Sequence, residues 1–180
     1  MKIIELNQES INLIKDQSNW DELNLDKTKG FIIFGPCGVG KTTAMNDFAT
    51  TNKLGWGHPK QPTMYANSGR SIYKSDLNSQ GLSRLVAAEG TGVLNLFKEH
   101  VLYLDDIGAE DTTTKHYGQT TDPIESLLEI RYNHREQVKT YATSNLSLKR
   151  LEERYGERIK SRLFEMFNVI VLKGEDRRLV

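Results

Sequence analysis

Short runs of consecutive apolar residues recur along the chain and predict five buried β-strands. They occupy residues 30–34, 62–67, 101–104, 140–145 and 168–172, and the second run is the weakest of the five. A strand that is apolar at successive positions, instead of alternate ones, is typical of a sheet covered on both faces. The pattern therefore indicates a central sheet with helices packed on either side.

Segments with helical periodicity lie between these runs. Residues 42–50 follow the first strand, and residues 148–167 precede the last, with Gly156 expected to divide the latter segment into two short helices. Asp122 stands before a proline, with a glutamate two residues further on, which is the pattern of a helix N-terminus. Strands that alternate with helices imply crossover connections, so the expected fold is α/β with a parallel sheet.

Two segments have the least regular pattern in the chain. Residues 69–99 lack a sustained period, and residues 110–121 form a polar stretch that predicts a loop. Loops of this length are usually functional or mobile.

The composition is typical of a soluble globular protein, and its overall charge gives no indication of nucleic-acid binding. The 180 residues suffice for one domain with its own core, predicted to span residues 1–180 with a short lead segment at 1–29. Basic and acidic residues both number 24, so any contact with nucleic acid must come from local patches. No apolar run approaches the ~20 residues of a membrane span, and the N-terminus turns polar too soon for a signal peptide. The single cysteine, Cys37, excludes an internal disulfide, which suits a reducing, cytoplasmic location.

The first strand leads into the sequence GPCGVGKTT, which has the spacing of a phosphate-binding loop between a strand and a helix. Its glycines allow several backbone N–H groups to point at one anion, and the helix N-terminus adds partial positive charge. Lys41 is expected on the β- and γ-phosphates, and the Thr42 hydroxyl on Mg²⁺. Cys37 occupies a variable position and is interpreted as filler, because no charged partner is visible beside it. The predicted nucleotide-binding residues here are Gly35, Pro36, Cys37, Gly38, Val39, Gly40, Lys41, Thr42 and Thr43.

Two carboxylates end the third strand. Functional residues of open α/β sheets gather at the carboxyl ends of strands. Asp105 is predicted to meet the Mg²⁺ held by Thr42, and Asp106 to polarise the attacking water. The alternative is a solvated acidic turn. Glu110 is a further carboxylate, ranked below Asp106 because it lies beyond Gly108.

The fourth strand ends in three polar residues, of which Asn145 is the candidate catalytic residue. An amide donates and accepts hydrogen bonds at once, which suits the positioning of a water near the γ-phosphate. A turn-forming asparagine after a strand is the alternative interpretation.

Arginines recur every fourth residue in the segment that follows. A solvated face with local ion pairs is the simplest interpretation, and it is retained for Arg150. Arg158 is instead predicted to be an arginine finger offered to the nucleotide of a neighbouring subunit. Near the end of the chain, Arg177 or Arg178 could touch the nucleotide of its own subunit, and an ordinary basic tail is an equal alternative.

Taken in order, five motifs resemble the AAA+ helicase-loader ATPases of the DnaC/DnaI/IstB group over about residues 30–178. In that family GPCGVGKTT is Walker A, LYLDDIG is Walker B, TSNL is sensor 1, YGERIKSRL carries the arginine finger, and GEDRR is a sensor-2-like segment. The resemblance implies a P-loop fold of the AAA+ (ASCE) type, with a five-stranded parallel sheet in the order 5-1-4-3-2.

The resemblance also implies an activity and partners. It implies Mg²⁺-dependent hydrolysis of ATP to ADP and phosphate, weak until subunits assemble into a homo-oligomer through Arg158 in trans. The family assembles on single-stranded DNA and delivers a replicative helicase, and its insertion-sequence relatives help a transposase. Such a protein is expected in the cytoplasm of a bacterium, encoded by the bacterium or by a phage. No membrane partner is expected.

The chain departs from the usual patterns in three places. The stretch before Gly35 is too short for the N-terminal domain by which loaders hold the helicase. Too few residues follow Arg158 for the helical lid of most other AAA+ proteins, an absence that is common in the loader group. Walker B ends in Asp-Asp where Asp-Glu is commoner. Arg70, Lys74 and Arg84 lie where relatives approach DNA, although surface solubility explains them equally well.

Two other classes of function compete with the loader hypothesis. A P-loop small-molecule kinase needs an arginine-bearing lid over the phosphates, and the order of Asn145 and Arg158 argues against it. A nucleotide-dependent binding module with little hydrolysis is compatible with the same motifs.

Overall fold

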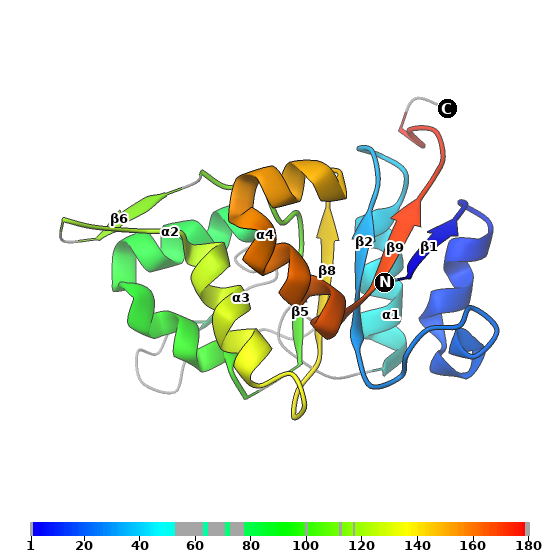
Figure 1. Ribbon diagram of the computed structural model, residues 1–180, viewed down its shortest axis with the longest axis horizontal. Helices are drawn as coiled ribbons and strands as arrows, with labels where there is room; N and C mark the ends of the chain where they lie inside the picture. Colours follow the sequence, from blue (N-terminus) through cyan, green and yellow to red (C-terminus); the bar gives the residue numbers. More distant parts are fainter. Residues whose placement is uncertain are drawn as a thin grey trace.

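The structure, a computed structural model, describes residues 2–52, 63–64, 71–72, 78–99, 101–111, 113–116 and 118–178. Its centre is a five-stranded parallel sheet in the order β1-β9-β2-β8-β5 (Figure 1). The strands are β1 (Ile3–Leu6), β2 (Gly30–Phe34), β5 (Leu102–Leu104), β8 (Thr140–Ser144) and β9 (Phe167–Leu172). The α/β class and the parallel sheet predicted from the sequence are confirmed.

The predicted strand order 5-1-4-3-2 is wrong at both edges of the sheet. The four predicted strands 5, 1, 4 and 3 are β9, β2, β8 and β5, and they are neighbours in the predicted order. β1, however, pairs with β9 at an edge where no strand was predicted. β1 is half exposed, so it lacks the continuous apolar run of a strand covered on both faces. The predicted second strand, residues 62–67, does not join the central sheet. Its described part, β3 (Thr63–Met64), pairs antiparallel with β4 (Ser71–Ile72) in a separate two-stranded sheet. The other residues of the run lie outside the described residues.

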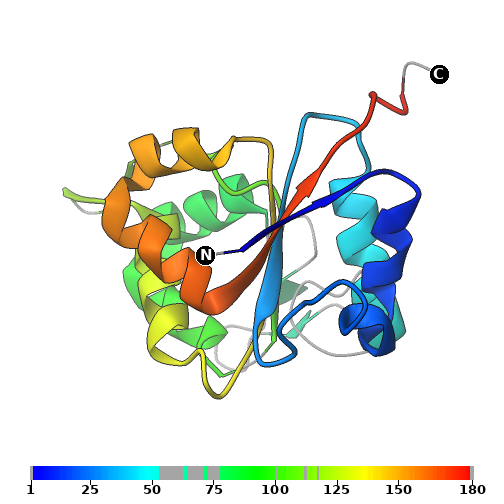
Figure 2. The same ribbon diagram turned by 45° about the vertical axis from the view of Figure 1, so that its right-hand side comes forward.

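Helices cover both faces of the sheet, as the apolar strands require (Figure 2). One face packs against α1 (Lys41–Asn52) and the short 3₁₀ helices η1 (Ser10–Lys15) and η2 (Gln17–Trp20). The other face packs against α2 (Ser79–Glu89), η4 (Thr91–Phe97), α3 (Pro123–Asn133) and α4 (Leu148–Met166). Successive residues of β2 alternate between the two layers, with Phe31 in the first core and Ile32 in the second.

The first core has an aromatic centre to which the N-terminal segment contributes. The rings of Phe31 and Phe48 lie 5.0 Å apart, and that of Trp20 stacks on Phe48 at 5.7 Å. Trp20 is fully buried and donates its indole N–H to the Ile14 carbonyl at 3.1 Å. The lead segment predicted at 1–29 therefore supplies both a strand and part of the core.

The N-terminal segment also braces the end of the chain. The backbone N–H of Lys173 donates to the Leu6 carbonyl at 2.8 Å, continuing the pairing of β1 with β9. Gln8 Nε2 donates to the Glu175 carbonyl at 2.6 Å, and Arg177 Nη2 donates to the Gln8 carbonyl at 3.0 Å. The last described residues are thus held against the first strand.

α3 begins where the sequence predicted. Asp122 caps it by accepting from the backbone N–H groups of Ile124 and Glu125, each at 3.0 Å. Arg131, on the buried face of α3, has no exposed surface, and it donates to the carbonyls of Phe97 and Lys139 and to the Thr140 hydroxyl. Burial lowers the pKa of Arg131 to about 10. The guanidinium joins the ends of η4 and α3 to the start of β8.

The break predicted at Gly156 is confirmed. Gly156 lies inside α4 with φ 85° and ψ 165°, which no helical residue adopts, so α4 consists of two helices that meet at this residue. The first helix ends with Arg154 and Tyr155, and the second carries Arg158 and Arg162.

The two segments predicted as irregular contain regular elements. Residues 79–97 form α2 and η4, and the polar stretch at 110–121 contains an antiparallel hairpin of β6 (Thr114–His116) and β7 (Gln119–Thr121). The hairpin projects beside α2, where His116 Nδ1 lies 2.8 Å from the Ala87 carbonyl (Figure 1). Its strands have three residues each and are polar, so alternation cannot be recognised in them.

Gly30 allows β2 and β8 to approach each other closely, and we expect its replacement to be costly. A Cβ atom at Gly30 would lie 1.7 Å from the Thr140 carbonyl oxygen, so Gly30→Ala requires the backbone to move. We expect a loss of about 1–3 kcal/mol in the free energy of unfolding, measured by urea denaturation. Gly92→Ala, with nothing within 4 Å of the added carbon, is the matched control. Equal stabilities of the two variants would contradict this account.

Candidate nucleotide-binding site

The predicted phosphate-binding loop connects β2 to α1. Gly38 and Gly40 have φ values of 77° and 101°, in the left-handed region that favours glycine. A Cβ at Gly35 would lie 2.5 Å from the Leu172 carbonyl oxygen, so the loop begins tight against β9. At its other end the loop leads into the N-terminus of α1. The backbone N–H groups and the helix dipole favour the binding of an anion there.

Lys41 is buried at the start of α1 and crosses the site. Its ammonium donates to Asn145 Oδ1 at 2.6 Å and to the Pro36 carbonyl at 2.7 Å. Burial lowers the pKa of Lys41, and the negative charge of Asp106 opposes that shift. The cation therefore lies beside acceptors inside the site, where a phosphate would compete for it.

Thr42 and Asp105 lie together, as predicted for a magnesium site. The Thr42 hydroxyl donates to Asp105 Oδ1 at 3.0 Å, and the Thr143 hydroxyl donates to the same oxygen at 2.5 Å. A hydroxyl and a carboxylate at the mouth of a phosphate-binding loop are hard oxygen ligands of the kind Mg²⁺ prefers. The oxygen ligands that these residues offer fit Mg²⁺ in their chemistry.

Asp106 faces Asn145 at the same edge of the sheet. Asn145 Nδ2 donates to Asp106 Oδ1 at 2.7 Å, while its Oδ1 accepts from Lys41. Burial raises the pKa of Asp106, as does the neighbouring charge of Asp105, whereas Lys41 and Asn145 act in the opposite direction. The backbone of Asp106 has φ 55°, and its N–H donates to the Thr143 hydroxyl at 3.0 Å. Asn145 thus links the cation and the carboxylate.

Lys41, Thr42, Asp106 and Asn145 line a pocket of about 330 Å³, within the range of small-molecule sites, and Asp105 lies outside this lining. The C-terminal segment closes one side, because the Arg177 N–H donates to the Gly38 carbonyl at 3.1 Å. Asp176 accepts from Arg178 Nε at 3.1 Å and raises the pKa of that guanidinium. The lining residues are Cys37, Gly38, Gly40, Lys41, Thr42, Thr43, Asp106, Asn145, Arg177 and Arg178.

Comparison with solved structures finds similarity to the crystal structure of the DnaC helicase loader. The two chains are 20% identical, and the similarity covers 88% of this chain and 92% of the other, with a TM-score of 0.49. No protein-family profile matches the sequence. No curated protein matches it either. In the part of the chain that the structure describes, none of the helices has the length and apolar character needed to traverse a bilayer.

Three predicted loop residues lie outside the pocket lining. Val39 is fully buried in the first core and anchors the loop from beneath. The Pro36 carbonyl accepts a hydrogen bond from the Lys41 ammonium. Gly35 lies close to β9, where a larger residue would not fit.

The interpretation of Cys37 as a residue without a charged partner is wrong. Arg178 Nη2 lies 2.8 Å from Cys37 Sγ. The two residues are 141 positions apart, so the contact depends on the tertiary fold and leaves no local pattern in the sequence.

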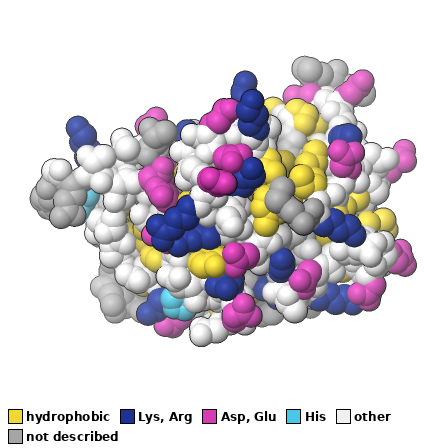
Figure 3. All heavy atoms as spheres, in the orientation of Figure 1, with side chains coloured by type: hydrophobic (Ala, Val, Ile, Leu, Met, Phe, Trp, Pro, Cys, Tyr) yellow, Lys and Arg dark blue, Asp and Glu magenta, His cyan; other side chains and the backbone are white. Residues whose placement is uncertain are grey.

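Arg158 is not brought to this pocket. It lies on the second helix of α4 with its side chain 73% exposed, and its Nη2 is 3.3 Å from Glu129 Oε1 on α3. Figure 3 shows basic and acidic side chains mixed over this part of the surface. An exposed ion pair of this kind is worth about 0–1 kcal/mol, so it restrains Arg158 weakly.

Sequence reasoning gave no role to Thr143, although it noted the polar end of the fourth strand. The Thr143 hydroxyl binds both the Asp105 carboxylate and the Asp106 N–H, so it fixes the acidic pair relative to β8. Three consecutive polar residues at the end of an otherwise apolar strand were the available indication. Of the DNA-contact candidates, Arg84 is exposed on α2, and Arg70 and Lys74 lie outside the described residues.

Proposed function

We propose that this chain is a Mg²⁺-dependent ATPase whose active site is completed by Arg158 of a second copy. The observation that carries the proposal is the continuous series of contacts from Lys41 through Asn145 to Asp106, beside the pair formed by Thr42 and Asp105. A cation, an amide, two carboxylates and a hydroxyl converge at the N-terminus of a helix. These are the groups that phosphoryl transfer to water requires.

Each side chain has a role in hydrolysis under this proposal. Lys41 exchanges its bonds to Asn145 and Pro36 for the β- and γ-phosphate oxygens. Asn145 is then free to orient a water, whose oxygen bonds to the γ-phosphorus while the bond to the β–γ bridging oxygen breaks. Asp106 accepts the proton of the water, and the bridging oxygen leaves with its electron pair on ADP. Thr42 and Asp105 would hold Mg²⁺, which would supply positive charge that stabilises the phosphate oxygens.

The position of Arg158 supports a role between subunits. The guanidinium is exposed and weakly restrained, and it does not line its own pocket. Arg177 and Arg178 already supply positive charge to the site from within the same chain. An exposed arginine is available to the triphosphate of a neighbouring copy, where water exclusion would strengthen its effect.

Single-stranded DNA, and a replicative helicase or a transposase, are the partners that the motif resemblance suggests. Since the chain has no net charge, DNA must be held by local cations, for which exposed Arg84 is a candidate. Binding through phosphates weakens steeply as salt is raised.

The test is ATPase activity as a function of protein concentration, with and without single-stranded DNA. We expect the rate per subunit to rise with concentration, because the site is complete only in an assembly, and DNA to lower the concentration required. Magnesium chelation should remove the activity. A rate per subunit that is constant over the range in which sedimentation shows assembly would contradict the proposal.

A further inference from the structure

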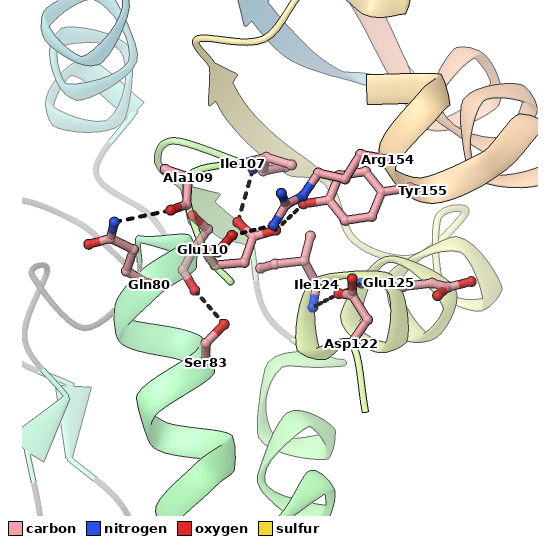
Figure 4. Close-up of polar contacts among 12 residues, drawn as sticks. Gln80, Ser83, Ile107, Ala109, Glu110, Asp122, Ile124, Glu125, Arg154 and Tyr155 are labelled. Atoms are coloured by element: carbon pink, nitrogen blue, oxygen red, sulfur yellow. Dashed lines mark hydrogen bonds and ion pairs between the residues drawn. The ribbon is translucent and has the colours of Figure 1, made fainter. Parts of the chain in front are cut away.

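Glu110 is a buried carboxylate at the end of the turn that follows Asp106. Its side chain has no exposed surface, and it lies between the turn at 107–109 and the first helix of α4, close to the start of α3 (Figure 4). The pocket lining does not include it. A buried carboxylate outside the nucleotide pocket needs partners, and those of Glu110 come from two different elements.

Each oxygen of the Glu110 carboxylate binds a different part of the fold. Oε2 accepts from the backbone N–H of Gly108 at 2.9 Å, within the acidic turn. Oε1 accepts from Arg154 Nη2 at 3.0 Å and from the Tyr155 hydroxyl, both on α4. The carboxylate therefore connects the turn that carries Asp106 to the last residues before the break at Gly156.

The turn is also fixed to the end of β8. The Ile107 N–H donates to the Thr143 carbonyl at 2.9 Å, and the Ser144 hydroxyl donates to the Ile107 carbonyl at 2.6 Å. A Cβ at Gly108, whose φ is 94°, would lie 2.3 Å from Leu146, the residue after Asn145. A displacement of Asp106 and Asn145 by nucleotide would therefore be passed to Gly108, and from there to Glu110.

On the other side, α4 carries the proposed finger. Arg154 and Tyr155 precede the glycine break, and Arg158 follows it by two residues. The network is incompletely satisfied in this arrangement, because Arg154 Nε is buried without a hydrogen-bond partner among the described residues. A buried donor without a partner costs free energy, so this atom does not oppose a shift of α4 that would bring it an acceptor.

We propose that Glu110 is a positioning residue that couples the nucleotide site of one copy to the Arg158 which that copy presents to its neighbour. The proposal rests on the proposed function above. Glu110 acts through α4, with no contact to the nucleotide. The competing interpretation is that the network only stabilises the monomer or the acidic turn of its own site.

A subunit-mixing experiment separates these interpretations. Asp106→Asn serves as the finger donor, with a defective site and an intact Arg158, and Arg158→Ala serves as the acceptor, with an intact site and no finger. In the mixture, activity arises where a donor finger meets an acceptor site. Glu110→Gln is then placed either in the donor or in the acceptor, because glutamine keeps an acceptor for Gly108 and loses the charge opposite Arg154.

In the donor, Glu110→Gln should lower the turnover of the mixture by at least about tenfold without changing KM for ATP, since the finger is misplaced and the acceptor pocket is intact. In the acceptor it should change turnover by less than about twofold. Glu153→Gln in the donor, adjacent to Arg154 and exposed, should have no effect.

The outcomes are distinct. If the parents do not complement each other, the proposed function fails, and this inference fails with it. If they complement and Glu110→Gln is harmless in the donor, or more harmful in the acceptor, only the inference is overturned. If Glu110→Gln melts below the assay temperature, Tyr155→Phe replaces it, because this change removes one hydroxyl from Glu110 and keeps the buried ring. A lower turnover with Tyr155→Phe in the donor than in the acceptor would support the inference, and equal turnover would overturn it.

Discussion

Replacing Arg158 with alanine is expected to lower the ATPase turnover of the assembled protein by about 10³- to 10⁵-fold, the range measured for arginine fingers. The guanidinium would stabilise charge on the transferring phosphoryl group of a neighbouring copy, and alanine cannot. KM for ATP should change little, because a finger that acts on the charge developing in the transition state contributes little to the binding of ATP in the ground state. The measurement is steady-state turnover at a concentration at which the wild-type rate per subunit has reached its plateau.

Two controls accompany this variant. Arg150→Ala removes an exposed arginine from the first helix of α4 and should leave turnover unchanged. Unfolding of Arg158→Ala should resemble that of the wild type, because the lost ion pair with Glu129 is exposed. A concentration-independent rate that Arg158→Ala leaves intact would disprove the assignment of the finger.

Replacing Lys41 with alanine is expected to abolish detectable binding of Mg-ATP in calorimetry. The ammonium is the buried cation of the pocket, and its charge-assisted bonds to phosphate are worth about 2–3 kcal/mol, or roughly 100-fold in affinity. The attraction between the Lys41 ammonium and the more distant phosphate charges is also lost, and it is strong in a site of low dielectric constant, so the total loss of affinity should be larger.

The fold should survive this substitution. Lys41 lines the pocket and belongs to neither hydrophobic core, so the melting temperature of the nucleotide-free variant should stay close to that of the wild type. Lys149→Ala, at an exposed position of α4, is the matched control and should bind as the wild type does. Undiminished affinity in Lys41→Ala would refute the assignment of the loop.

The centre of the fold and of the candidate site could be predicted because both follow from local sequence. The apolar run before Gly35 and the periodic segment after it specify a strand, a turn and a helix. The carboxyl ends of parallel strands meet at one edge of the sheet, which is why Asp106 and Asn145 were expected near Lys41. The observed contacts join these three side chains, 104 positions apart at the extremes.

What escaped prediction depends on contacts between distant residues or on short elements. The edge strand β1 is half exposed and has four residues, so its apolar pattern is weak. Glu110 was ranked below Asp106 because it lies beyond Gly108, but burial against α4 gives it partners 44 and 45 positions away. Arg178 reaches Cys37 across 141 positions. No periodicity in the sequence encodes such pairs, because each depends on how the elements pack.

The bracing of the C-terminal segment by the N-terminal one has a thermodynamic consequence. Gln8 accepts from Arg177 and donates to Glu175, while Arg177 also holds the phosphate-binding loop through Gly38. Fraying of the first strand and opening of the candidate nucleotide pocket are therefore expected to be linked equilibria. A ligand that closes the pocket should slow the exchange of the backbone amides of β1 with solvent, although none of the residues of β1 lines the pocket.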